Sequence, residues 1–496
     1  MPTKGHASKM QGIKANFVFN VLGTLASLVV AFVTVPIYVS HIGAARYGVV
    51  SIVWLLLGYF GFLDLGLSRA SVNALSKLKT SSQEERSKVL ITTFSLNLAL
   101  GTLGGLIIYF AGGFLFEHLV DVPESLKPEI VDVFPWIAAL LPLAMISGVA
   151  IGVLESQDRF LAANVLQVAG TTFGQVLPVL CAVFISPSLS TVIPAAALAR
   201  GLSVALTLAF VLYDERPFYL RSFDRKRARE LLGYGGGASV SAILGPLLTS
   251  LDQLVISSVL GVTAVTYYAV PMSLITRSQI LATAMTRTLF PQWSRTSPDE
   301  ANRLAEKALV SLAYGYGLIC APAIILVTPF IAWWMGKDFA LIAGPVAELL
   351  LVGAWINGLA YIPAVLLQGQ NRPDIVAKFN ALEIIPFIGV LWLLATHFGL
   401  IGSAVAWVLR ASVDAALLFA VARFWANRFP VLLPPIGLIL TAFLFVQIAN
   451  PTLVQGLAFA TLLAGAGAIS GLIFDVYARS FIFSLFDTTR LRILGK

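Results

Sequence analysis

The sequence predicts an all-α, polytopic membrane protein with about 14 transmembrane helices in two repeated six-helix lobes, followed by two C-terminal helices. The composition is the first reason, since 58% of the 496 residues are hydrophobic and 12% are charged, against about 25% charged in soluble domains. The second is that uncharged runs of spanning length recur along the whole chain. The third is that short patterns of the first half return in the second. Runs this long and continuous form helices rather than barrel strands.

Each expected span is an apolar run bounded by charged or turn-forming residues. The two longest runs each hold two spans, because Ser186-Pro187-Ser188 and Asn450-Pro451 interrupt them. In chain order, the expected spans are 16–40, 48–75, 89–115, 133–155, 160–185, 189–213, 233–260, 265–290, 307–334, 342–368, 375–397, 400–425, 432–449 and 453–474.

The charged residues between the spans predict the orientation. Lys and Arg gather in segments 76–88 and 214–232 and after Phe474, whereas acidic residues crowd the loop 116–132. Basic loops stay in the cytoplasm, so both termini are expected there. The basic residues are spread over many short loops instead of one face, which argues against a nucleic-acid partner.

An internal repeat divides the chain. Gly43 and Gly261 are 218 residues apart, and each follows an expected span. The matched arginine pairs are Arg69 with Arg287, Arg159 with Arg372, and Arg200 with Arg410. The expected organisation is an N-lobe over 1–213, a basic cytoplasmic linker over 214–232, a C-lobe over 233–428, and two last helices with a cytoplasmic tail over 429–496.

Duplicated halves are a recurring plan of transporters, with the substrate held between them. Together with Pro36, Gly43, Tyr47-Gly48 and Asp64-Leu65-Gly66-Leu67, this organisation resembles the polysaccharide transporters of the multidrug/oligosaccharidyl-lipid/polysaccharide exporter superfamily, in particular the Wzx-type O-antigen flippases. The resemblance implies a multi-pass protein of the bacterial inner membrane. It further implies that the two lobes alternate access to undecaprenyl-pyrophosphate-linked oligosaccharide, an O-antigen or exopolysaccharide repeat unit, and that the two last helices help to form a lipid-facing groove.

Arginines inside the spans are the candidate substrate-binding residues. Arg200, Arg277 and Arg410 fall near the middle of their spans, where a charge is costly and usually functional. A guanidinium binds pyrophosphate in a bidentate manner and stays charged. The alternative for Arg410 is an ion pair with Asp414, one helical turn away. Arg69 and Arg287 lie closer to the cytoplasmic ends, and their alternative role is to anchor the helix at the interface.

Acids inside the spans are the candidate ion-coupling residues. They are Asp64, Asp252, Glu383 and Asp414. A buried carboxylate must be paired or protonated, so each is a candidate for coupling to H⁺ or Na⁺, and each is also a candidate structural partner for an arginine.

Two rival functions stay open. One is a MATE-like cation-coupled drug exporter, which would favour an acidic cavity. The other is a membrane enzyme acting on lipid-linked sugar. No catalytic residue, metal site or cofactor is expected, because the four histidines are dispersed and no nucleotide-binding loop is present. Polysaccharide polymerase and chain-length proteins are the expected partners besides the membrane lipid.

Overall fold

The computed structural model describes residues 4–64, 66–78, 81–214, 223–231, 251–449 and 451–474. Every regular element in these ranges is a helix, so the predicted all-α class is confirmed. In the first half they are α1 (Lys4–Phe60), η1 (Gly61–Asp64), α2 (Leu67–Lys77), α3 (Gln83–His118), η2 (Glu124–Leu126), α4 (Lys127–Ser156), α5 (Phe160–Phe184) and α6 (Leu189–Asp214). The second half holds the helix Leu251–Leu260, α8 (Val262–Ser278), α9 (Ile280–Trp293), α10 (Pro298–Met335), α11 (Lys337–Gly369), α12 (Pro373–Val421), α13 (Trp425–Ala449) and α14 (Leu453–Phe474).

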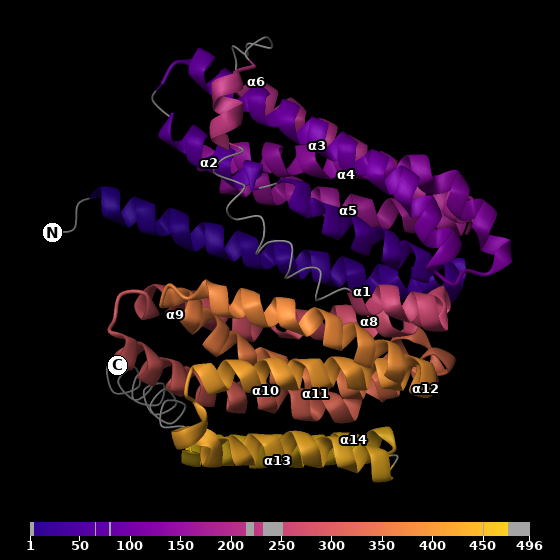
Figure 1. The fold of residues 1–496 in the computed structure, drawn as a ribbon, viewed down its shortest axis with the longest axis vertical. Helices are drawn as coiled ribbons and strands as arrows, with labels where there is room; N and C mark the ends of the chain where they lie inside the picture. The colour runs from indigo at the N-terminus through magenta and orange to yellow at the C-terminus, as the bar shows by residue number, and fades with distance from the viewer. Residues whose placement is uncertain are drawn as a thin grey trace, which may run out of the picture. The chain divides into compact units, whose positions relative to one another are not determined.

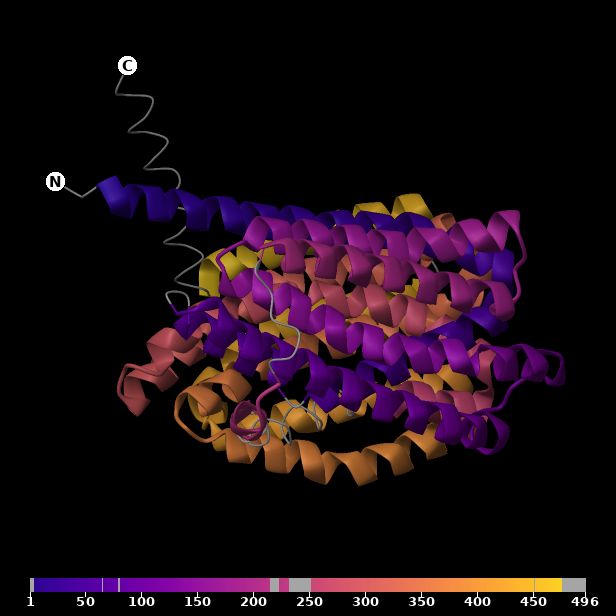
Figure 2. The same cartoon turned by 90° about the horizontal axis from the view of Figure 1, so that it is seen from above.

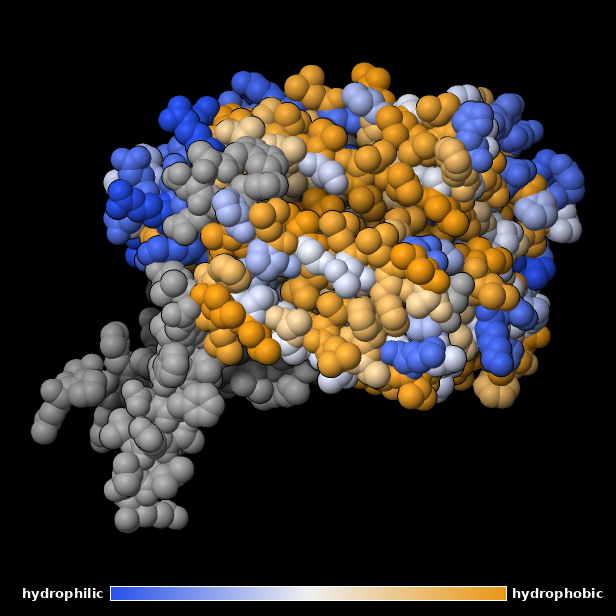
Figure 3. All heavy atoms as spheres, turned by 90° about the horizontal axis from the view of Figure 1, so that it is seen from below, coloured by the Kyte–Doolittle hydropathy of each residue, from blue (hydrophilic) through white to orange (hydrophobic). Residues whose placement is uncertain are grey.

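Ten helices within the described ranges are long and apolar enough to cross a membrane. Their outer surfaces carry large apolar side chains, such as Phe110, Phe184 and Ile385, which are 73%, 79% and 80% exposed. On the face that Figure 3 shows, apolar side chains form a broad band and polar side chains gather toward its ends. Such a surface is stable only against lipid, so the chain is a multi-pass membrane protein.

Parts of three predictions lie outside the described residues. These are residues 215–222 and 232 of the expected linker, residues 233–250 of the expected seventh span, and the tail 475–496. For this reason the number of fourteen spans stays a prediction.

The chain forms two compact units. The first contains the helices from α1 to α6, and the second contains Leu251–Leu260 and the helices from α8 to α14, apart from the first residues of α8. Within each unit the long helices run along a common direction, as Figures 1 and 2 show. This is the arrangement expected of helices that cross one bilayer.

Glycines on α3 let it approach α4 closely in the first unit. A Cβ on Gly105 would lie 2.5 Å from the carbonyl oxygen of Ala138, and one on Gly101 would lie 2.6 Å from the Cα of Pro142. Gly101 and Gly105 are one turn apart, which is the small-residue spacing by which membrane helices pack. The α3–α4 contact therefore depends on the absence of side chains at both positions.

Two turns repeat between the units with the same backbone conformation. Gly43 and Gly261 have φ of 80° and 82°, a region that glycine adopts without strain. Asp158 and Asn371 have φ of 64° and 58°. The next residue in each turn donates its backbone N–H to a carbonyl five residues back, with N···O distances of 2.9 Å from Arg159 to Leu154 and 2.8 Å from Arg372 to Leu367. The matched sequence positions therefore share local structure.

Two expected spans are interrupted. Segment 48–75 breaks at η1 and at Gly66, which has φ 69° and precedes α2. Segment 265–290 breaks at Gln279, between α8 and α9. Gln279 is buried, and its Nε2 donates to the carbonyl of Ala354 on α11 at 3.4 Å. This contact to another helix depends on the tertiary fold, so the hydropathy of the segment gave no sign of the interruption.

Candidate functional site

A group of charged side chains is buried inside the second unit. Asp252 lies on the helix Leu251–Leu260, and Glu383 and Arg410 lie on the two legs of α12. The legs fold back on each other at Gly399, which has φ 61° and ψ −140°, a conformation suited to glycine. The side chains of Arg410 and Glu383 are 9% and 6% exposed, and Asp252 is 1% exposed.

Arg410 is paired within this group. Its Nη1 lies 3.8 Å from Oε2 of Glu383, and its Cζ lies 5.4 Å from the centroid of the Phe387 ring. The carboxylate that lies within ion-pair distance of Arg410 is that of Glu383, and not that of Asp414 as expected. Asp414 is still close enough for its charge to act on both Arg410 and Glu383. Arg410 therefore has Glu383 as an ion-pair partner, without a hydrogen bond between them, and is less available to an anionic substrate.

Asp252 is satisfied by a different partner. The hydroxyl of Tyr268 on α8 donates to Oδ2 of Asp252 at 2.7 Å, and the backbone N–H of Gln253 donates to Oδ1 at 2.8 Å. Tyr268 is fully buried, and the charge of Arg410 acts on Asp252 as well. The sequence gave no indication that Tyr268 belongs to the site, because tyrosine is common in membrane helices.

The group thus contains three carboxylates and one guanidinium. If all four were ionised, the net charge would be negative in a region of low dielectric, which is unfavourable. A proton on one of the carboxylates would reduce this excess negative charge. In the described ranges no cluster of three His, Cys, Asp or Glu residues has the geometry to hold a metal ion.

Arg200 in the first unit is the counterpart of Arg410. It lies on α6, is partly exposed, and forms no hydrogen bond or ion pair with any residue that the structure describes. The repeat matches Glu383 with Gly170 and Asp414 with Val204. A side chain at Gly170 would collide with Oγ of Ser203. The first unit therefore has no acid at the position that pairs with the arginine in the second.

Arg277 and Arg287 lie on an exposed face of the second unit. Arg277 is in the last turn of α8, beside the interruption at Gln279, and Arg287 is on α9. Both side chains are exposed, as are those of Ser273, Thr276 and Thr288 on the same face. Ile280 on this face is also 62% exposed, so the face mixes polar and apolar side chains. Two arginines on it are costly against lipid.

Asp64 and Arg69 lie around the start of α2. Asp64 accepts hydrogen bonds from Oγ and the backbone N–H of Ser68, at 2.7 and 3.2 Å. It therefore acts as a cap for this helix. Arg69 lies on α2, and its side chain is outside the described part of the structure.

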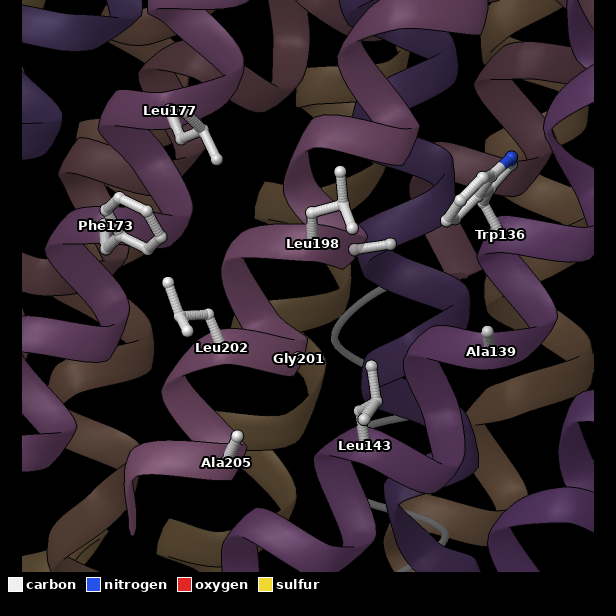
Figure 4. A pocket seen from close by; sticks show the side chains of 10 residues that line it. Trp136, Ala139, Leu143, Phe173, Leu177, Leu198, Gly201, Leu202 and Ala205 are labelled. Carbon is white, nitrogen blue, oxygen red and sulfur yellow. The ribbon is translucent and has the colours of Figure 1, made fainter. Parts of the chain in front are cut away.

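An apolar groove of about 550 Å³ lies on the first unit. Figure 4 shows Trp136 and Leu143 from α4, Phe173 and Leu177 from α5, and Leu198 and Leu202 from α6 around it. No charged residue lines it. Helical periodicity places Arg200 on nearly the opposite side of α6 from Leu198 and Leu202, so this groove is separate from the arginine.

A buried acid outside the candidate site joins α13 to α10 and α11 within the second unit. Glu348 on α11 is 3% exposed. Oγ1 of Thr328 on α10 donates to it at 2.6 Å, and Nε2 of Gln447 on α13 donates at 3.0 Å. This acid is fully used by structural hydrogen bonds.

The fold and these buried charges define a helical membrane protein with two compact units. Residues 13–297 match the family described as "Polysaccharide biosynthesis protein". Because the match covers more than half of the chain, the protein belongs to this family. It is a polysaccharide transporter of the superfamily that the sequence resembled.

Two relatives agree with this assignment. The chain is 26% identical over 410 residues to the putative O-antigen transporter of Shigella flexneri, covering 81% of this chain and 96% of the relative. It is 25% identical over 195 residues to the probable low-salt glycan biosynthesis flippase Agl15 of Haloferax volcanii, covering 39% and 41% of the two chains.

Solved structures share the fold. The lipid II flippase MurJ in an inward closed conformation aligns with a TM-score of 0.64 and 14% identity, over 95% of this chain and 100% of that one. An inward-facing MATE family multidrug transporter aligns with a TM-score of 0.66 and 19% identity, over 82% and 94%. Identities this low establish the architecture alone.

Proposed function

We propose that this protein is a flippase for lipid-linked oligosaccharide. It moves an undecaprenyl-pyrophosphate-linked O-antigen or exopolysaccharide repeat unit from the cytoplasmic to the periplasmic leaflet. The observation that carries the proposal is the difference between the two matched arginines: Arg410 is held by Glu383, whereas Arg200 has no partner among the described residues. A spanning helix keeps a charge of this kind for a ligand of opposite charge.

The substrate follows from the chemistry of the exposed cations. Arg277 and Arg287 are exposed and Arg200 is partly exposed, and a guanidinium makes bidentate hydrogen bonds to phosphate oxygens. A pyrophosphate headgroup matches these donors. The prenyl tail stays in lipid while the headgroup crosses by alternating access, in which the two units move as bodies.

The membrane potential contributes to the driving force. An inside-negative potential of about 100 mV favours outward movement of a negative charge, and its free energy falls by about 2.3 kcal/mol per charge. Two charges on the pyrophosphate gain about 4 to 5 kcal/mol. Export therefore proceeds downhill without nucleotide hydrolysis.

The buried carboxylates of the second unit supply ion coupling. Asp252, Glu383 and Asp414 share one guanidinium, so a change in their protonation changes the net charge buried in α12 and its neighbours. H⁺ fits this group, with Na⁺ as the alternative. Asp64 contributes less to ion coupling, because its carboxylate already accepts a hydrogen bond from the hydroxyl of Ser68.

The proposed setting is the bacterial inner membrane, with both termini in the cytoplasm. The protein acts without catalysis and hands its cargo to polymerase and chain-length proteins on the periplasmic side.

A MATE-like exporter of cationic drugs is the second candidate. The fold similarity to MATE transporters and the acidic excess around Arg410 favour it. Depletion of the protein in its host separates the two. A flippase predicts loss of surface polysaccharide and accumulation of lipid-linked repeat units, with unchanged resistance to cationic drugs. Normal surface polysaccharide together with increased drug sensitivity would overturn the flippase proposal.

A further inference from the structure

A polar cleft of about 570 Å³ lies at one end of the first unit. It is formed where α3 and α5 begin and where α4 and α6 end. The residues that line it are Ser81, Gln83, Arg86, Gln157, Asp158, Arg159 and Asp214. Because it lies at the ends of spanning helices, it is at the level of the lipid headgroups.

The charges of the cleft are balanced. Arg86 is 7% exposed. Nη2 of Arg159 lies 2.6 Å from Oδ1 of Asp214, and its Cζ lies 5.8 Å from the centroid of the Phe210 ring. The lining thus has two basic side chains, Arg86 and Arg159, and two acidic ones, Asp158 and Asp214. A purely anionic ligand would meet as much repulsion as attraction, so the lining fits a ligand that carries both signs.

Oε1 of Gln83 is one of the buried acceptors of the cleft that lack a donor within the described residues. A buried acceptor without a partner is costly, and a ligand with N–H groups would satisfy it.

The matched positions of the second unit lack three of these four charges. The helices α3 and α10 begin after matched serines, Ser82 and Ser297, which matches Arg86 with Ala301. Asp158 matches Asn371, which forms the same turn. Asp214 matches Phe424, which is 2% exposed. The second unit keeps only Arg159 of these charges, as Arg372, so Arg86, Asp158 and Asp214 are additional to what the repeat requires.

We propose that this cleft binds the headgroup of phosphatidylethanolamine from the adjoining leaflet. The phosphate faces Arg86 and Arg159, and the ammonium donates to Asp158 and to Oε1 of Gln83. Apolar surface for the acyl chains lies beside the cleft, where Leu161 and Tyr213 are 47% and 71% exposed. Under the proposed orientation this is the cytoplasmic leaflet. The proposal does not depend on which cargo the protein carries.

The test compares lipids that differ only in the headgroup. The purified full-length protein is incubated with an equimolar mixture of phosphatidylethanolamine, phosphatidylcholine and phosphatidylglycerol with identical acyl chains, and the retained lipid is measured by native mass spectrometry. Choline carries no N–H, so the protein should retain phosphatidylethanolamine over phosphatidylcholine by at least about tenfold, the effect of one hydrogen bond to a charged group.

Variants locate the site. Asp158→Asn gives the first unit the asparagine that the second unit has at the matched position, Asn371, and should abolish the preference for phosphatidylethanolamine. The converse variant Asn371→Asp is the control and should leave this preference intact. Gln83→Leu should weaken the preference as well, so the test stands if one variant fails to fold. Equal retention of ethanolamine and choline lipids, preference for phosphatidylglycerol, or an unchanged preference in folded Asp158→Asn and Gln83→Leu would overturn the proposal.

Discussion

Arg200 and Arg410 occupy matched positions of the two repeats, yet among the described residues only Arg410 has a carboxylate neighbour, with Glu383 3.8 Å away. The chain thus contains its own comparison: the same residue type on the same repeated helix is neutralised in one unit and left open in the other. This difference separates a substrate-binding role for Arg200 from a coupling or structural role for Arg410.

Replacing Arg200 should abolish export without loss of folded protein. Arg200→Ala removes a guanidinium that no described residue uses, so the free energy of unfolding should change little, whereas surface polysaccharide should fall by at least about tenfold, the value of one charge-assisted hydrogen bond. Surface polysaccharide and protein level are measured together in cells. Lys337→Ala, at the start of α11, is the control. Full export in Arg200→Ala would count against a substrate role.

Replacing Arg410 should instead lower stability. Arg410→Ala leaves Glu383 buried and unpaired, at a cost of about 3–5 kcal/mol. The double variant Arg410→Ala with Glu383→Ala should recover part of this loss, because Glu383 no longer lacks a partner while Asp252 and Asp414 still lack the charge of Arg410. Thermal unfolding of the purified proteins checks both values. If the two losses simply add, the pair is not energetically coupled.

Replacing Asp252 should uncouple transport from the ion gradient. Asp252→Asn removes a titratable group while an amide can still accept from Tyr268. We expect translocation in vesicles to continue but to lose its response to an imposed pH gradient. Asp64→Asn, at the cap of α2, is the comparison and should keep the response. An unchanged pH response in Asp252→Asn would remove it from the coupling group.

Glu348 should fix α13 to the second unit. Glu348→Ala leaves Thr328 and Gln447 without their acceptor, which costs about 1–3 kcal/mol. A double-mutant cycle with Gln447→Ala should show coupling between the two positions, measured by thermal unfolding. Independent effects would mean that the hydrogen bond contributes nothing to the docking of α13.

Close packing of α3 on α4 should make Gly105 intolerant of a side chain. Its Cβ would meet a backbone oxygen that cannot move away, so Gly105→Ala should destabilise the protein by about 1–3 kcal/mol. Gly113 on the same helix has nothing within 4 Å of its Cβ position, and Gly113→Ala should leave the unfolding temperature unchanged. Equal effects of the two variants would show that helix propensity, not packing, decides the outcome.

Much of the fold could be predicted from hydropathy and turn residues. The expected spans 160–185 and 189–213 agree with α5 and α6 to within one residue, because lipid requires long apolar helices and Ser186-Pro187-Ser188 ends the first. Gly43 and Gly261 were matched by sequence alone and share their backbone conformation.

Contacts between distant segments could not be predicted in the same way. The sequence suggested Asp414 for Arg410 because helical neighbours one turn apart are visible in sequence, but Glu383 reaches it only after α12 folds back at Gly399. The interruption at Gln279 and the hydrogen bond from Tyr268 to Asp252 also depend on tertiary packing. Arg277 and Arg287 could be identified from the sequence as arginines inside expected spans. That both side chains are exposed could be seen only in the structure.

The most direct test of the account is translocation by purified protein in proteoliposomes. Two prenyl-linked oligosaccharides are compared, one joined through pyrophosphate and one through an uncharged linker, with the wild-type protein and with Arg200→Ala. The account predicts that the wild type moves the pyrophosphate form at least about tenfold faster than the uncharged form, and that Arg200→Ala loses this preference. Translocation of the pyrophosphate form at the wild-type rate by Arg200→Ala would contradict it.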